Sequence, residues 1–170
     1  MKLDKFYFML CLLFLISNST VSAYVWPTAS KEITSDFGPR DVGEGWDWHS
    51  GIDIRASIGT EVYAVAKGTV TRVDNVNDSK SGLWIEIDHG GMRSRYLHLS
   101  EINVSMGDIV QAGQIIGKSG NTNGTPKGCD PHLHFDFGYS KDNGIHPLKY
   151  LPYDNTREPV ITNVEPTVYE

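Results

Sequence analysis

The sequence predicts an all-β protein: an antiparallel β-sandwich or barrel-like single domain with long loops and little helix. Short β-branched and aromatic stretches recur along the chain, separated by Gly, Asn, Asp and Ser, as in proteins built from many short strands. After position 23, no window of a dozen residues shows a sustained 3.6-residue apolar period, so long amphipathic helices are not expected.

The expected strands combine high β-propensity with turn-forming residues at their ends. They cover residues 61–66, 69–74, 83–88, 92–98, 114–117 and 132–137. Lys67-Gly68 and His89-Gly90-Gly91 are expected to form hairpin turns. Residues 117–131 contain four glycines and are expected to form a long loop, which usually implies a function in a compact domain.

The N-terminus has the pattern of an export signal. Lys2 and Lys5 supply positive charge, residues 6–16 form an apolar run, and residues 21–23 (Val-Ser-Ala) form a small-residue cleavage site. The apolar run is shorter than the ~20 residues needed to span a bilayer. We therefore expect a signal peptide over 1–23, one domain over 24–153, and a tail or the stub of a further domain over 154–170.

The net charge and the cysteine content limit the partners and covalent links that this protein is expected to have. The net charge is −6, and it becomes −7 once Lys2, Asp4 and Lys5 leave with the signal. No basic cluster is present, so nucleic acid is an unexpected partner. Cys129 would be the single cysteine of the exported part, which excludes an internal disulfide there. Cys11 lacks the small preceding residue of a lipoprotein signal, so no stable membrane anchor is expected. We expect a secreted or periplasmic monomer.

The His-x-His motif in Pro131-His132-Leu133-His134-Phe135 indicates a binding pocket. On a strand, residues i and i+2 share a face, so His132 and His134 enter one pocket while Leu133 faces the core. On a helix the two histidines would diverge by about 200°. The flanking aromatic residues favour the strand.

His49 and Asp53 in Trp48-His49-Ser50-Gly51-Ile52-Asp53-Ile54 form a second pair. Gly51 and the β-branched residues argue against a helix. A straight strand would separate the two Cα atoms by about 13 Å, too far for ligands of one metal. We therefore expect a bend at Gly51, with His49 on a loop and Asp53 on the next strand.

These residues, with His98 in Tyr96-Leu97-His98-Leu99, indicate a zinc hydrolase, because three imidazole or carboxylate donors around an open fourth position suit a catalytic zinc. A single histidine in a β-protein is more often a surface or a hydrogen-bonded core residue. That interpretation suits His89 and His146, but one pocket explains the other five residues together.

At these positions the chain resembles the lysostaphin-type zinc endopeptidases, which cut the peptide part of bacterial peptidoglycan. The resemblance covers about residues 33–151. Its segments are 33–40 (Ile-Thr-Ser-Asp-Phe-Gly-Pro-Arg), 49–54, 59–64, 87–90, 96–99, 113–117, 131–135 and 147–151.

The resemblance implies that His49, Asp53 and His134 bind one Zn²⁺ per chain and that His98 and His132 flank a zinc-bound water as catalytic residues. The expected activity is a secreted zinc metalloendopeptidase acting on peptidoglycan cross-links or stem peptides. Which of His98 and His132 acts as base is open, and so is the bond that is cut.

Two places depart from the family pattern. Residues 127–130 (Lys-Gly-Cys-Asp) replace the usual small-residue run before the His-x-His motif, and Trp46-Asp47-Trp48 is an unusually aromatic approach to His49. Cys129 could be a rival zinc ligand, although a bystander role is favoured. Trp46 and Trp48 could line a peptide groove, but core positions are favoured. Arg40 could face substrate or cap a loop.

Two other classes of function fit the sequence less well. A non-catalytic relative that binds peptidoglycan or regulates a hydrolase would be expected to have lost ligands, and this chain keeps all five residues. Residues 107–116 also resemble the strand-turn-strand of biotinyl and lipoyl carrier domains. Those domains need a modifiable lysine at an exposed hairpin tip, and Lys67 before Gly68 does not match that pattern.

Overall fold

The computed structural model describes residues 24–41, 43, 45–140 and 143–152, and within them the fold is nearly all β. The expected signal peptide and C-terminal tail lie outside the described residues. The strands are β1 (Ile33–Ser35), β2 (Gly38–Asp41), β3 (Trp46–His49), β4 (Gly51–Arg55), β5 (Glu61–Tyr63), β6 (Gly68–Asp74), β7 (Leu83–Asp88), β8 (Arg93–Ile102), β9 (Ile109–Val110), β10 (Ile115–Ser119), β11 (His132–Ser140) and β12 (Asn143–Gly144). A short 3-10 helix spans Pro147–Lys149. The described residues include no helix long and apolar enough to cross a membrane.

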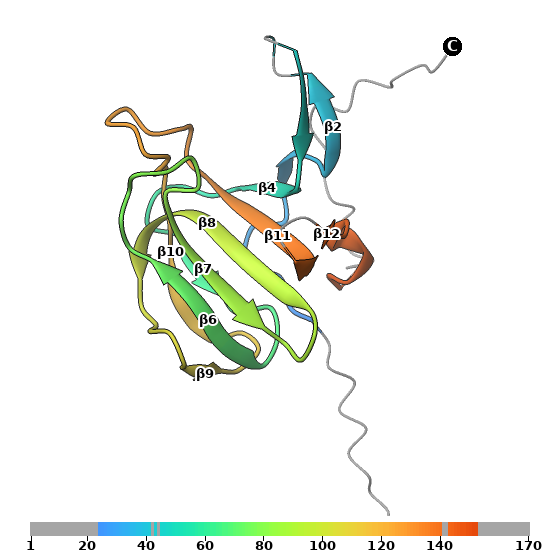
Figure 1. The fold of residues 1–170 in the computed structure, drawn as a ribbon, viewed down its shortest axis with the longest axis vertical. Helices are drawn as coiled ribbons and strands as arrows, with labels where there is room; N and C mark the ends of the chain where they lie inside the picture. Colours follow the sequence, from blue (N-terminus) through green and yellow to red (C-terminus); the bar gives the residue numbers. More distant parts are fainter. Residues whose placement is uncertain (1–23, 42, 44, 141–142, 153–170) are drawn as a thin grey trace, which may run out of the picture.

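Ten strands form one antiparallel sheet with the main order β1-β4-β11-β8-β7-β6-β9. Strand β10 pairs with both β5 and β8 and so folds the sheet back on itself. Figure 1 shows β11, β8, β7 and β6 side by side, with β10 behind them and the separate β2–β3 hairpin projecting beyond the sheet. The predicted antiparallel all-β fold is confirmed.

Alternation along β11 separates the core from the site. Leu133, Phe135 and Phe137 are buried in the apolar core, which lies on one face of the sheet. His132, His134 and Asp136 point to the opposite face, as the period of two residues requires. The core therefore fixes the register of the strand that carries the His-x-His motif, since a slip of one residue would exchange the two faces.

Two local expectations were wrong. Lys67-Gly68 is not a hairpin turn, because β6 pairs with β7 and β9 whereas β5 pairs with β10. Gly68 instead allows close strand packing, since a Cβ there would lie 2.5 Å from the carbonyl oxygen of Asp88. His49 is not on a loop but is the last residue of β3. The bend expected at Gly51 falls one residue earlier, at Ser50, because Gly51 is already the first residue of β4. Asp53 lies on that strand, as expected.

Candidate metal and catalytic centre

Three side-chain atoms converge at the end of the β2–β3 hairpin. Nε2 of His49 lies 3.1 Å from Oδ1 of Asp53 and 2.9 Å from Nδ1 of His134, and the last two atoms are 2.9 Å apart. His49 and His134 are buried, and Asp53 is nearly so. Donors of a tetrahedral zinc with bonds of about 2.0 Å lie about 3.3 Å apart, so this spacing suits one ion with little adjustment.

Strand pairing explains how residues far apart in sequence meet here. His134 on β11 is the direct cross-strand partner of Asp53 on β4, so the two side chains emerge side by side. Gly51 permits this pairing, because a Cβ at that position would lie 2.3 Å from the carbonyl oxygen of Phe135. His49 arrives from the neighbouring hairpin, where Gly38 opposes it on β2.

The hydrogen bonds of the two imidazoles leave lone pairs facing one another. The Nδ1–H of His49 donates to the carbonyl oxygen of Asp36 at 2.7 Å, so Nε2 of the neutral ring keeps its lone pair. Nε2 of His134 lies 3.2 Å from Oδ1 of Asp136, which favours the proton on that nitrogen and the lone pair on Nδ1. Two lone pairs and a carboxylate oxygen at these distances repel unless a cation lies among them. Two imidazoles and a carboxylate are donors that Zn²⁺ accepts, so the residues fit the ion.

The pKa values of His134 and Asp53 also indicate a cation site. Burial lowers the pKa of His134, but the Asp136 and Asp53 carboxylates outweigh it and raise that pKa to about 9. Burial raises the pKa of Asp53, yet the neighbouring His134 and His49 hold it far below its ordinary value. Both shifts express the affinity of this cluster for positive charge.

His132 and His98 lie beside the cluster without joining it. Their rings have centroids 4.7 Å apart, and Nε2 of His132 lies 3.5 Å from Oδ1 of Asp53. The Nδ1–H of His132 donates to the carbonyl oxygen of Asp130 at 2.6 Å. The Nδ1–H of His98 donates to the carbonyl oxygen of Thr122 at 2.7 Å. These hydrogen bonds place the Nδ1 proton of each ring on a carbonyl, so that the neutral form of either ring has its lone pair on Nε2.

A β-bulge aims His98 at this face. Leu83 pairs with Leu99 and Ile85 with Tyr96, so two residues of β8, Leu97 and His98, oppose a single residue of β7. Simple alternation would place His98 on the core face with Tyr96. Instead His98 has φ 62° and is the only non-glycine with positive φ among the residues described. Such backbone conformations carry strain and cluster at functional sites.

Burial, with a smaller contribution from the neighbouring His132 and His134, lowers the pKa of His98 to about 4, against the raising effect of the Thr122 carbonyl. The ring is therefore neutral at physiological pH. A neutral imidazole with a free Nε2 is suited to accept a proton.

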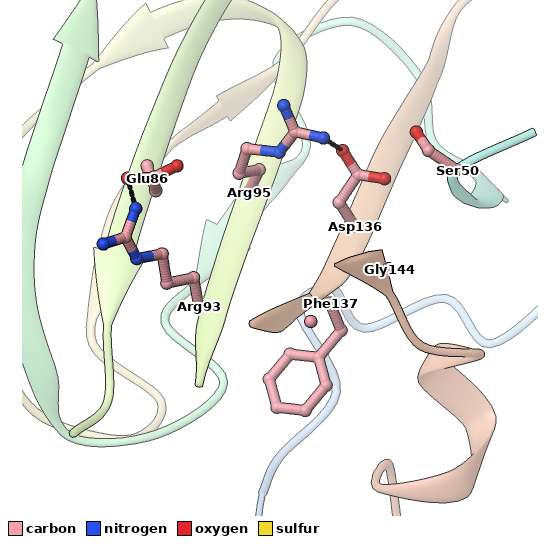
Figure 2. A pocket seen from close by; sticks show the side chains of 8 residues that line it. Ser50, Glu86, Arg93, Arg95, Asp136, Phe137 and Gly144 are labelled. Carbon is pink, nitrogen blue, oxygen red and sulfur yellow. Dashed lines mark hydrogen bonds and ion pairs between the residues drawn. The ribbon is translucent and has the colours of Figure 1, made fainter. Parts of the chain in front are cut away.

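Asp136 and Arg95 are site residues that the sequence reasoning missed. Asp136 is buried behind His134 and forms an ion pair with Arg95, its cross-strand partner on β8. Figure 2 shows the Arg95 guanidinium reaching Asp136 across the strands, with a second pair, Glu86 and Arg93, one strand further along. Asp136 follows His134 by two residues, so the same alternation that pairs the histidines could have indicated it. Outer carboxylates of this kind orient metal-binding histidines.

An open groove of about 630 Å³ runs over the cluster. Arg40 lines it and reaches Oδ2 of Asp53 at 3.4 Å and Oγ of Ser35 at 3.0 Å. Trp48 also lines the groove and is 62% exposed, and Trp46 is 69% exposed, so the favoured core position of the two tryptophans was wrong. A wall of exposed aromatic and charged residues suits an extended peptide.

The remaining histidines and Cys129 lie outside the cluster of His49, Asp53 and His134. His89 is hydrogen-bonded to the carbonyl of Lys67 and to Ser94, as expected for a satisfied histidine. His146 stacks on Phe37 and lies 3.4 Å from Asp36. Cys129 lies on the groove wall, with Sγ 4.0 Å from Nδ1 of His132.

Three buried donors at the floor of an open groove in an antiparallel sheet, with two more histidines beside them, form an arrangement that suits a metallopeptidase. The model of Peptidase family M23 matches residues 47–147, and the chain belongs to that family. Lysostaphin of Staphylococcus simulans is 35% identical over 119 residues, covering 68% of this chain and 24% of that protein. Peptidoglycan DD-endopeptidase ShyA of Vibrio cholerae is 42% identical over 116 residues, covering 65% of this chain and 26% of that protein.

Solved structures agree with the sequence relatives. The catalytic domain of lysostaphin superposes with a TM-score of 0.60 at 34% identity, covering 70% of this chain and 90% of that one. A zinc-containing peptidase from Vibrio cholerae superposes with a TM-score of 0.65 at 33% identity, covering 76% of this chain and 41% of that one. The chain spans about a quarter of the length of the two curated relatives above.

Proposed function

We propose that this chain is an exported zinc metalloendopeptidase that hydrolyses peptide bonds in bacterial peptidoglycan. The observation that carries the proposal is the convergence of His49, Asp53 and His134 within 3.1 Å of one another at the floor of an open groove. The substrate class is supported by the relatives, which include lysostaphin and a peptidoglycan DD-endopeptidase.

In this proposal His49, Asp53 and His134 hold the ion and leave one position open. A zinc ion bound there would supply a water of pKa about 7 and would polarise the scissile carbonyl. The Asp136–Arg95 pair fixes the ring of His134, and the Asp36 carbonyl fixes that of His49.

His98 and His132 are the acid and base of the proposal. His98 is neutral and carries its free Nε2 on the groove face, so it is suited to take a proton from the attacking water. His132 lies beside it and is suited to stabilise the developing oxyanion or to protonate the leaving amine. The groove wall at Arg40 and Trp48 would hold the peptide across these groups.

Digestion of purified peptidoglycans with different cross-links tests the activity and identifies the bond. Glycyl-glycine bridges and direct D-alanyl to diaminopimelate links would release fragments that mass spectrometry distinguishes. We expect fragments from one cross-link type, and none after metal removal by a chelator. Intact muropeptides from every substrate would contradict the proposal. Sequencing the N-terminus of the exported protein tests the signal, with Tyr24 as the expected first residue.

A further inference from the structure

One wall of the groove is formed by two loops that pack against each other. The loop over residues 75–82 joins β6 to β7, and the loop over residues 120–131 joins β10 to β11; Figure 1 shows the two side by side. The backbone N–H of Gly124 donates to Oδ1 of Asn77 at 2.6 Å. A Cβ at Gly124 would lie 2.8 Å from the backbone of Ser79. The two loops therefore form one packed surface.

Lys80 and Asn123 line the groove on this surface. Each adjoins the contact between the two loops, one on either side, so their side chains belong to the same part of the wall. The backbone N–H of His98 donates to the carbonyl oxygen of Ser81 at 3.0 Å, which ties the first loop to a proposed catalytic residue. A peptide that lies across His98 therefore passes close to this wall.

Lys80 carries a charge that the protein itself does not neutralise. Arg40 also lines the groove, but its guanidinium nitrogens lie 3.4 Å from carboxylate oxygens of Asp47 and Asp53. Lys80 is exposed and forms no ion pair with any residue that the structure describes. A carboxylate that reaches the Lys80 ammonium therefore gains an ion pair without displacing an existing one.

Asn123 offers amide donors on the same wall. Its Oδ1 accepts hydrogen bonds from the backbone N–H and the hydroxyl of Thr125, at 3.1 and 2.7 Å. These two donors identify which end of the amide is the oxygen, so Nδ2 keeps two N–H groups for other partners. Within the described part of the chain, Nδ2 forms no hydrogen bond. An ammonium and an amide without acceptors are a donor set for an anionic oxygen.

We propose that Lys80 and Asn123 bind a free carboxylate of the substrate, and that the enzyme therefore prefers peptides with a free carboxylate next to the cleaved bond. This inference rests on the proposed peptidase function and names its substrate class. In a D-alanyl to diaminopimelate link, the carbon beside the cleaved nitrogen carries a free carboxylate. An internal glycyl-glycine bond has none. The two donors thus favour the first kind of cross-link.

Calorimetric binding of matched peptides tests the subsite. The probes are synthetic cross-linked peptides with a D-alanyl to diaminopimelate bond, either with the carboxylate beside that bond free or with the same group amidated. A third peptide is amidated at its C-terminal carboxylate instead. The protein is the full zinc-loaded chain with His98→Ala, which prevents cleavage during the titration. We expect the free peptide to bind about 10-fold more tightly than the first amidated one, as for a hydrogen bond to a charged group.

Two substitutions in this background assign the preference to the wall. Lys80→Met and Asn123→Asp are each expected to bring the ratio of the two dissociation constants toward 1. Asn123→Asp keeps an oxygen for the two Thr125 donors and loses the amide N–H groups, so the loop retains its hydrogen bonds. Lys127→Met is the matched control and is expected to keep the ratio near 10, because Lys127 lies on the same loop but does not line the groove.

Equal binding of the free and amidated peptides would overturn the subsite, as would an unchanged ratio in both Lys80→Met and Asn123→Asp. Weaker binding of the C-terminally amidated peptide alone would overturn the preference for a carboxylate beside the cleaved bond. Rates measured with His98 restored separate this inference from the proposed function. Cleavage of the free and amidated peptides with equal kcat/KM would overturn the subsite alone, whereas selective binding without cleavage of either peptide would overturn the peptidase function.

Discussion

Asp53 and His134 are direct cross-strand partners on β4 and β11, and Oδ1 of Asp53 lies 2.9 Å from Nδ1 of His134. The sheet register alone therefore sets two of the three proposed metal donors at binding distance. The apolar residues of β11 fix that register, so the packing of the core determines the geometry of the site.

The proposed acid and base can be separated from the ligands by mutation. His98→Ala and His132→Ala are each expected to keep zinc and to lower kcat by about 10²- to 10⁴-fold, because neither belongs to the buried triad and each acts on proton transfer. The double variant should lose less than the product of the single losses if both act on one transition state. Zinc analysis accompanies each assay. An empty site in His132→Ala would make His132 a ligand and leave the base role to His98.

The pH profile tests the base. A histidine whose pKa lies at about 4 instead of 6.5 stays deprotonated, and so competent as a base, until the pH falls to about 4. The acid limb of kcat/KM is therefore expected well below pH 6.5. Zinc content must be measured at every pH, because protonation of ligands also releases metal. An acid limb at or above pH 6.5 with zinc retained would contradict the role of His98.

The carboxylate behind His134 is expected to tune metal affinity. Asp136→Asn removes the charge that lies 3.2 Å from Nε2 of His134 while keeping the shape of the side chain. Zinc affinity, measured by competition with a chelator, should fall by about 10- to 100-fold. Glu86→Gln is the matched control, because Glu86 is also a buried acid paired with an arginine but lies on β7, two strands away from the strand of His134. Equal losses in both variants would show a general effect on the sheet.

The local sequence pattern predicted much of the fold. Period-two alternation identified the His-x-His strand and the face it presents, and turn residues located the hairpin at His89-Gly90-Gly91. The break between the strands of His49 and Asp53 was expected at Gly51 and lies one residue earlier, at Ser50, while Asp53 is on the following strand as expected. These features depend on neighbours in sequence, which is why the sequence predicts them.

Features that depend on distant neighbours were not predictable. The bulge that turns His98 toward the groove arises from the pairing of β8 with β7. The exposure of Trp48 depends on the hairpin standing away from the main sheet. Asp136 becomes part of the site through Arg95, a residue on another strand. In each case the deciding contact joins segments that the sequence alone does not bring together.

Metal analysis of the purified full chain tests the central claim most directly. After dialysis that removes weakly held ions, the unaltered protein and His98→Ala are expected to retain one zinc per chain. His49→Ala and His134→Ala are each expected to lose it, since each removes one of the three convergent donors. Retention of stoichiometric zinc in both His49→Ala and His134→Ala would contradict the account.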